Sequence, residues 1–270
     1  MEKAEIKFNN GRVIKNYFKG FSDLFDAEAE NLREIKKIQY PHIPHPFKID
    51  YEDKKIELPN SGEDLEKVFS RKGFDKDLIE DVFTFLIEEE TQYFDKLRSD
   101  RLSLKNNSDN PHFEANKFTD SEFLEEGAKK DLEDLLDVNI PSSEITYSKF
   151  DPEASNFLKK KNRIYSIDFG YMRPAERVYA PIYLAFHLDY PNSVKEIKET
   201  DKIKNEFLHL CEDYTDKYEI LRNVVEVFSY HGNGLVNRPD EDIDKKGRNI
   251  LGKIEQIPKI LSTEDYKSYF

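Results

Sequence analysis

A segment between Ile145 and Gly170 constrains this chain most, because it reads as three short strands separated by a loop and a tight turn. An oxygen-bearing side chain stands near each junction: Asp151 follows the first strand, Asn156 opens the second and Asp168 closes the third. Phosphoryl transfer requires one carboxylate to orient an attacking hydroxyl and hard oxygen ligands for Mg²⁺. The segment therefore predicts a site at which these three side chains converge.

The first sixty residues are rich in strand signals. Two short strand-like runs, Ala4 to Phe8 and Arg12 to Phe18, flank Asn9-Asn10-Gly11, which is a strong hairpin signal. An amphipathic helix is expected next, followed by a second pair of strands; their ranges are 26–38, 47–51 and 55–58. The sequence Pro59-Asn-Ser-Gly62 then interrupts the sheet.

Beyond residue 60 the pattern changes to mainly helical. Helical periodicity is expected over 64–69, 77–97, 202–214, 218–230 and 247–261. Residues 99–120 are polar and aperiodic, and a short helix is expected over 121–136, so we interpret about 99–136 as an insertion.

Composition narrows the classes of function. The formal net charge of −13 disfavours a protein that follows a nucleic-acid backbone, which needs clustered cations. The single cysteine, Cys211, rules out an internal disulfide or a thiolate metal cluster, and the six histidines lack zinc-site spacing. No apolar run has the length of about 20 residues that spans a bilayer, and the amino terminus lacks a secretory pattern. We expect a cytoplasmic protein without nucleic-acid or membrane partners.

The spacing of these residues resembles that of the protein-kinase-like superfamily, through most of residues 4 to 190. Its compact members include aminoglycoside and choline phosphotransferases, RIO kinases and small tRNA-modification kinases. In this superfamily a catalytic-loop Asp precedes a metal-binding Asn by five positions, and Asp-Phe-Gly follows about a dozen residues later. Asp151, Asn156 and Asp168-Phe169-Gly170 fit this pattern. The resemblance implies that Asp151 is the catalytic base or orienting residue, and that Asn156 and Asp168 bind Mg²⁺.

The amino-terminal half agrees with the resemblance. Lys15 lies on an expected strand, as the superfamily's nucleotide-binding lysine does, and Glu28 on the following helix is its expected partner, with Glu30 and Glu34 as alternatives. The path from Ile43 to Leu65 resembles a kinase hinge, which implies that backbone groups of Glu57 and Leu58 face the adenine.

The chain also departs from the superfamily. Only Gly11 and Gly20 precede Gly62, so the glycine-rich phosphate loop is missing or replaced. Lys149 stands where a histidine is common, Pro152 replaces a bulky apolar residue, and no complete Ala-Pro-Glu segment follows Gly170. These differences favour a small-molecule or atypical kinase over a regulated protein kinase.

The predicted fold is α+β and two-lobed, with a small antiparallel β lobe (1–59) and a mainly helical lobe (60–270) that carries the insertion. The resemblance implies a phosphotransferase that uses ATP and Mg²⁺ to modify a hydroxyl of a small polar molecule. Two alternatives stay open: an atypical serine/threonine protein kinase of the RIO or tRNA-modification type, and a pseudokinase that binds a protein partner. The identity of the acceptor does not follow from the sequence.

Overall fold

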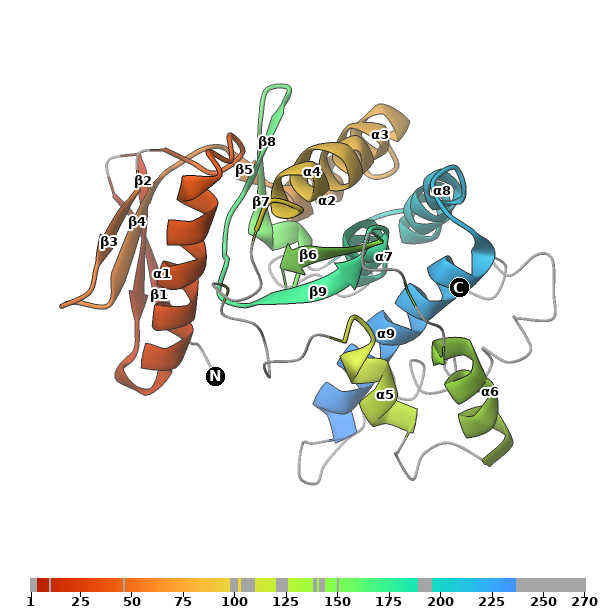
Figure 1. The fold of residues 1–270 in the computed structure, drawn as a ribbon. Coiled ribbons are helices and arrows are strands. Elements are labelled where there is room, and N and C mark those ends of the chain that lie inside the picture. Colours follow the sequence, from red (N-terminus) through yellow and green to blue (C-terminus); the bar gives the residue numbers. More distant parts are fainter. Residues whose placement is uncertain are drawn as a thin grey trace.

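A computed structural model describes residues 4–9, 11–45, 47–97, 102, 110–119, 126–137, 140, 144–149, 151–188 and 196–236. A small lobe formed by a four-stranded sheet and one long helix lies beside a larger, mainly helical part (Figure 1). Two clusters of buried apolar side chains form the cores: one lies within the larger part, and the other joins the small lobe to Phe94, Leu97, Phe169 and Met172 of the larger part. The two-lobed α+β prediction is confirmed. The helix expected over 247–261 lies outside the described residues.

The small lobe is an antiparallel sheet in the order β1-β2-β4-β3. Its strands are β1 (Ala4–Asn9), β2 (Arg12–Tyr17), β3 (Lys48–Asp50) and β4 (Lys55–Pro59). Because side chains alternate along a strand, Val13, Lys15 and Tyr17 point to one face of β2. The opposite face carries charged pairs such as Arg12–Glu57, with 3.0 Å between nitrogen and oxygen.

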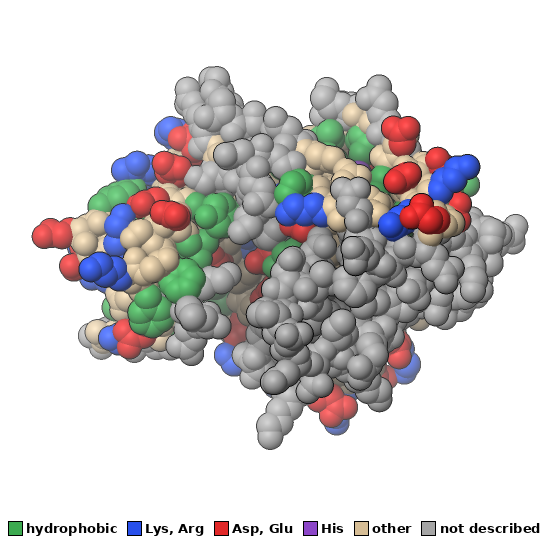
Figure 2. Space-filling model, turned by 90° about the horizontal axis from the view of Figure 1, so that it is seen from below, with side chains coloured by type: hydrophobic (Ala, Val, Ile, Leu, Met, Phe, Trp, Pro, Cys, Tyr) green, Lys and Arg blue, Asp and Glu red, His purple; other side chains and the backbone are tan. Residues whose placement is uncertain are grey.

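The helix α1 (Ser22–Lys37) follows a short 3₁₀ turn, η1 (Lys19–Phe21), and starts four residues earlier than expected. Its buried face includes Phe25, Ala29, Leu32 and Ile35, which pack in the small-lobe core. Apolar side chains also gather on the surface of this lobe, among charged ones (Figure 2).

The connection between the parts is tight. Gly62 has a φ of +132°, which side chains rarely allow, and a Cβ there would lie 2.3 Å from the Lys159 carbonyl oxygen. The two-residue strand β5 (Glu63–Asp64) pairs with β7 (Phe157–Lys160), and β7 pairs with β8 (Arg163–Ser166). The chain leaving the small lobe is thus bound directly to the hairpin that carries Asn156 and Asp168 at its base.

The helices of the larger part surround a second strand pair, β6 (Ile145–Lys149) and β9 (Met172–Glu176). They include α2 (Leu65–Lys72), α3 (Lys76–Thr84), α4 (Thr91–Phe94), α7 (Tyr179–His187), α8 (Thr200–Glu212) and α9 (Lys217–Val236). The single helix expected over 77–97 is divided by a π-helical turn, η2 (Phe85–Glu90). Among the helices of the described residues, none combines the length and apolar character that crossing a bilayer would require.

The stretch 99–120 is not wholly irregular, which corrects the prediction for that region. It contains α5 (Phe113–Thr119), and α6 (Glu126–Leu136) follows. Glu226 of α9 accepts hydrogen bonds from the backbone N–H groups of Glu114 and Ala115, at 3.1 and 2.7 Å, and also pairs with buried Arg173. A buried carboxylate therefore caps α5 and docks it on α9.

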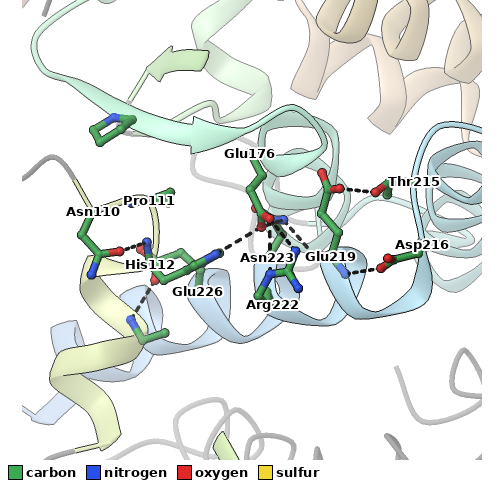
Figure 3. Close-up of polar contacts among 12 residues, drawn as sticks. Asn110, Pro111, His112, Glu176, Thr215, Asp216, Glu219, Arg222, Asn223 and Glu226 are labelled. Atoms are coloured by element: carbon green, nitrogen blue, oxygen red, sulfur yellow. Dashed lines mark hydrogen bonds and ion pairs between the residues drawn. The ribbon is translucent and has the colours of Figure 1, made fainter. Parts of the chain in front are cut away.

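A second buried cluster lies one turn away along α9. Glu176, at the end of β9, accepts hydrogen bonds from Arg222 at 2.7 Å and Asn223 at 2.7 Å, and its carboxylate is 3.2 Å from His112 (Figure 3). Burial alone would raise the pKa of Glu176, but His112 and Arg222 outweigh it and hold that pKa below its usual value. The second cluster thus joins β9, α9 and the residue just before α5.

Candidate active site

Lys15 is the cation of the site. Its Nζ lies 2.9 Å from Glu28 Oε2 of α1 and 2.9 Å from Asp168 Oδ1. Of the glutamates considered from the sequence, Glu28 is thus the one that the structure places against Lys15, while Glu34 pairs with Lys37 on the outer side of the helix. The ammonium thus joins β2 to Asp168, which lies 153 positions after Lys15 in the sequence.

The environment of Lys15 stabilises its charge. Glu28 is 1% exposed and also accepts a hydrogen bond from the Tyr17 hydroxyl. Burial by itself lowers the pKa of Lys15, but the carboxylates of Asp168 and Glu28 outweigh burial and hold this pKa well above its usual range. Lys15 is therefore protonated at neutral pH and presents a fixed cation between the lobes.

Asp151 lies just beyond β6, where the chain turns through the 3₁₀ segment η5 (Ala154–Asn156). The side-chain Nδ2 of Asn156 donates to the Asp151 backbone oxygen at 2.9 Å. This bond orients the side-chain oxygen of Asn156, Oδ1, away from Asp151. Tyr230 of α9 hydrogen-bonds the Asp151 side chain, and the pKa of Tyr230 is raised first by burial and then by this carboxylate. Sequence patterns gave no sign of Tyr230, because it comes from a helix 79 positions away.

Asp168 has a φ of +61°, a left-handed conformation that is uncommon for residues with a side chain. The next residue, Phe169, is fully buried against Phe94, with 6.3 Å between ring centroids. Asn31 of α1 donates to the Phe169 carbonyl oxygen at 3.0 Å. The Asn31 bond ties the Asp-Phe-Gly turn to the small lobe, and the Phe94 contact ties it to α4 of the larger part.

The pairing of β7 with β8 places Asn156 next to Asp168. Phe157 pairs with Ser166, and the Ile167 N–H donates to the Asn156 carbonyl oxygen at 3.0 Å. Asp168 therefore comes directly after the residue opposite Asn156. A carboxylate and an amide oxygen are a suitable donor set for Mg²⁺, which binds few protein ligands and takes others from phosphate and water. No group of three or more His, Cys, Asp or Glu side chains suited to a metal occurs within the described residues.

The expected adenine contacts, Glu57 and Leu58, lie on β4 within the sheet. The Tyr17 N–H donates to the Lys54 carbonyl oxygen at 3.1 Å, and the Asn60 N–H donates to the Gly11 carbonyl oxygen at 2.8 Å. Because hydrogen-bonded pairs alternate along an antiparallel ladder, the backbone groups of even-numbered residues of β4 point toward β2. The backbone N–H and C=O groups of Leu58 therefore point toward β2, whereas those of Glu57 point toward β3, where Glu57 pairs with Lys48. The role of Glu57 and Leu58 beside an adenine stays a prediction, and the segment 60–62 continues from them out of the sheet.

One cavity of about 720 Å³ lies away from these residues. It opens between η2, the start of β6 and the α8–α9 connection, and its lining is rich in carboxylates. The lining includes Glu88, Asp95, Glu144, Arg177, Asp216 and Glu219, and none of the residues predicted from the sequence.

Comparison with known proteins supports the fold. No protein-family model matches the chain, and no curated protein sequence matches it. The structure is similar to a choline/ethanolamine kinase family protein from Mesorhizobium loti, with a TM-score of 0.59, 12% identity and coverage of 100% of this chain and 88% of that one.

Two further solved structures are similar. Choline kinase LicA from Streptococcus pneumoniae has a TM-score of 0.58 and 15% identity, over 95% of this chain and 89% of that one. The GDP complex of aminoglycoside 2'-phosphotransferase-IIIa has a TM-score of 0.63 and 12% identity, over 94% and 89%. The chain has the protein-kinase-like fold, as the sequence predicted.

Proposed function

We propose that this protein is an ATP- and Mg²⁺-dependent phosphotransferase that acts on a hydroxyl of a small polar molecule. The observation that carries the proposal is the contact of Lys15 with both Glu28 and Asp168, at 2.9 Å each. Asp168 directly follows the residue that is bonded to Asn156, and the fold is similar to that of small-molecule kinases. A charged lysine between two carboxylates is suited to orient nucleotide phosphates.

The sheet supplies an apolar surface beside that lysine. Ile6 and Ile56 pair with Lys15 on either side, and Val13 and Leu58 lie on the same face by alternation. Ile6 is 57% exposed, so a planar base could cover it and remove apolar area from water. The backbone of 60–62 at the end of this face is the proposed edge contact of the base.

The roles of the remaining residues follow from their positions. Asn156 and Asp168 would hold Mg²⁺, which neutralises phosphate charge when bound. Asp151 would accept a hydrogen bond from the acceptor hydroxyl and so orient its oxygen toward the phosphate. Tyr230 limits the rotation of Asp151 by hydrogen-bonding its side chain. Neighbouring structures that contain AMP, or GDP with kanamycin, support a nucleotide and a small-molecule acceptor here.

Nucleotide-dependent stabilisation tests the proposal. ATP with Mg²⁺ should raise the unfolding midpoint more than ATP with a chelator does, because ligands that bind only the folded state stabilise it. Asp168→Asn keeps the side-chain volume but weakens the metal site, so it should lose the Mg²⁺-dependent part of the shift. Equal shifts in wild type and Asp168→Asn would remove Asp168 from the metal site. No shift with any nucleotide would favour a scaffold protein instead.

A further inference from the structure

Lys149 is a buried cation at the centre of the catalytic segment. It is the last residue of β6 and is 1% exposed. Its Nζ donates to the carbonyl oxygens of Asn156 and Ile167, at 3.1 Å each. In the sequence, Lys149 stands out only as a departure from the protein-kinase-like superfamily, in which a histidine is common at this position.

These two carbonyl groups belong to the segments that present the proposed metal ligands. Asn156 is one ligand, and Ile167 directly precedes the other, Asp168. The Ile167 N–H also donates to the Asn156 carbonyl oxygen at 3.0 Å, so the ammonium strengthens an existing cross-connection at the base of the β7–β8 hairpin. We infer that Lys149 is a positioning residue that fixes Asn156 and Asp168 relative to each other; this rests on the proposed function.

The conformation of Asp168 gives this bond its importance. A left-handed residue with a side chain is strained and persists only where its surroundings enforce it. The carbonyl group before Asp168 is held by Lys149, and the carbonyl group after it, that of Phe169, is held by Asn31 at 3.0 Å. The peptide group before the strained residue is therefore held by Lys149, and the peptide group one residue further on, after Phe169, is held by Asn31.

A lysine suits this position because an ammonium has three N–H donors and accepts nothing. Its Nζ also lies 3.7 Å from the ring centroid of Phe157 and 5.4 Å from that of Phe169, so two aromatic faces help to solvate the charge. Burying a cation is nevertheless costly. A cation that is buried next to two proposed metal ligands, and bonded to the segments that carry them, points to a role in the site.

The test replaces Lys149 by methionine, which fills similar space without a donor. Mn²⁺ binding in the presence of ADP, measured by electron paramagnetic resonance, should weaken by about 10- to 100-fold, as for other residues that support metal ligands. ADP affinity with a chelator should change less than about 3-fold, because Lys149 lies behind the ligands and not in the nucleotide site. Lys160→Met, an exposed change in the same hairpin, is the matched control and should bind Mn²⁺ as wild type does.

Each outcome decides the inference. Wild-type Mn²⁺ affinity in a folded Lys149→Met would overturn it, and restored affinity in Lys149→Arg, which returns a cation with donors, would support it. Unfolding of both variants would show that Lys149 serves the fold and would also overturn the inference. If the wild type itself binds no Mn²⁺ with ADP, the proposed function fails, and this inference fails with it.

Discussion

Replacing Lys15 by methionine removes the ammonium that the structure places between Glu28 and Asp168. Glu28 is 2% exposed in its side chain, whereas Asp168 is 41% exposed and can turn toward water. The variant therefore leaves one carboxylate buried without its cation. Methionine retains most of the apolar stem, so the packing between β2 and α1 changes little.

The magnitude follows from that burial. Removing one partner of a buried ion pair costs about 3–5 kcal/mol, because the other charge stays desolvated. The lower end applies here, since Tyr17 still donates to Glu28 and Asp168 reaches solvent. A loss of about 3 kcal/mol corresponds to a fall in the unfolding midpoint of about 6–12 °C for a chain of this size.

Thermal unfolding followed by circular dichroism measures this effect. Lys48→Met, on the outer face of the same sheet, is the matched control. The Lys48 side chain is 64% exposed, so this variant should lose less than about 1 kcal/mol of unfolding free energy. Adding Glu28→Gln to Lys15→Met should recover at least about 1 kcal/mol, because no buried carboxylate remains. Equal midpoints for Lys15→Met and Lys48→Met, or strictly additive losses in the double variant, would refute the reasoning.

Three further predictions concern the frame of the site. Gly62→Ala should cost more than about 2 kcal/mol, because its Cβ would meet the Lys159 carbonyl at 2.3 Å, whereas Gly127→Ala, an open helical position, should stabilise by about 0.5–1 kcal/mol; chemical denaturation of both checks this. Glu226→Ala should cost about 3–5 kcal/mol by leaving a buried arginine without its carboxylate, and limited proteolysis should then cleave near α5; an unchanged digestion pattern would contradict the docking role. Because the folded-state pKa of Glu176 is lowered, its stabilisation is present above about pH 4.3 and is lost as pH falls through the folded pKa, so Glu176→Gln should show a flatter loss of midpoint on acidification than wild type does.

Local signals were sufficient for the small lobe. The Asn-Gly sequence predicted the β1–β2 hairpin, and apolar spacing predicted an amphipathic helix at α1. The choice of Glu28 over Glu30 and Glu34 required the structure. The spacing of Asp151, Asn156 and Asp168 was enough to predict that the segments carrying these side chains adjoin, because a tight hairpin between β7 and β8 leaves little freedom.

Elements without periodicity were missed. All nine residues of α7 are buried, so this helix has no polar face and no amphipathic pattern to detect. The short helix α5 depends on Glu226, more than 100 positions away, for its cap. Strand ends, and the backbone groups that a neighbouring strand uses, depend on register, so sequence alone does not decide how the backbone of Glu57 and Leu58 is used.

Phosphate transfer by wild type and Asp151→Asn tests the central claim most directly. The measurement is the transfer of γ-phosphate from ATP, with Mg²⁺, to a panel of small hydroxyl compounds, together with nucleotide affinity for both proteins. Asparagine preserves the shape of the side chain and should preserve nucleotide affinity, because Asp151 is not a proposed metal ligand. The account predicts turnover by the wild type and a loss of about 10²- to 10⁴-fold in Asp151→Asn. Equal turnover by the two proteins, or none by the wild type with any acceptor, would contradict it.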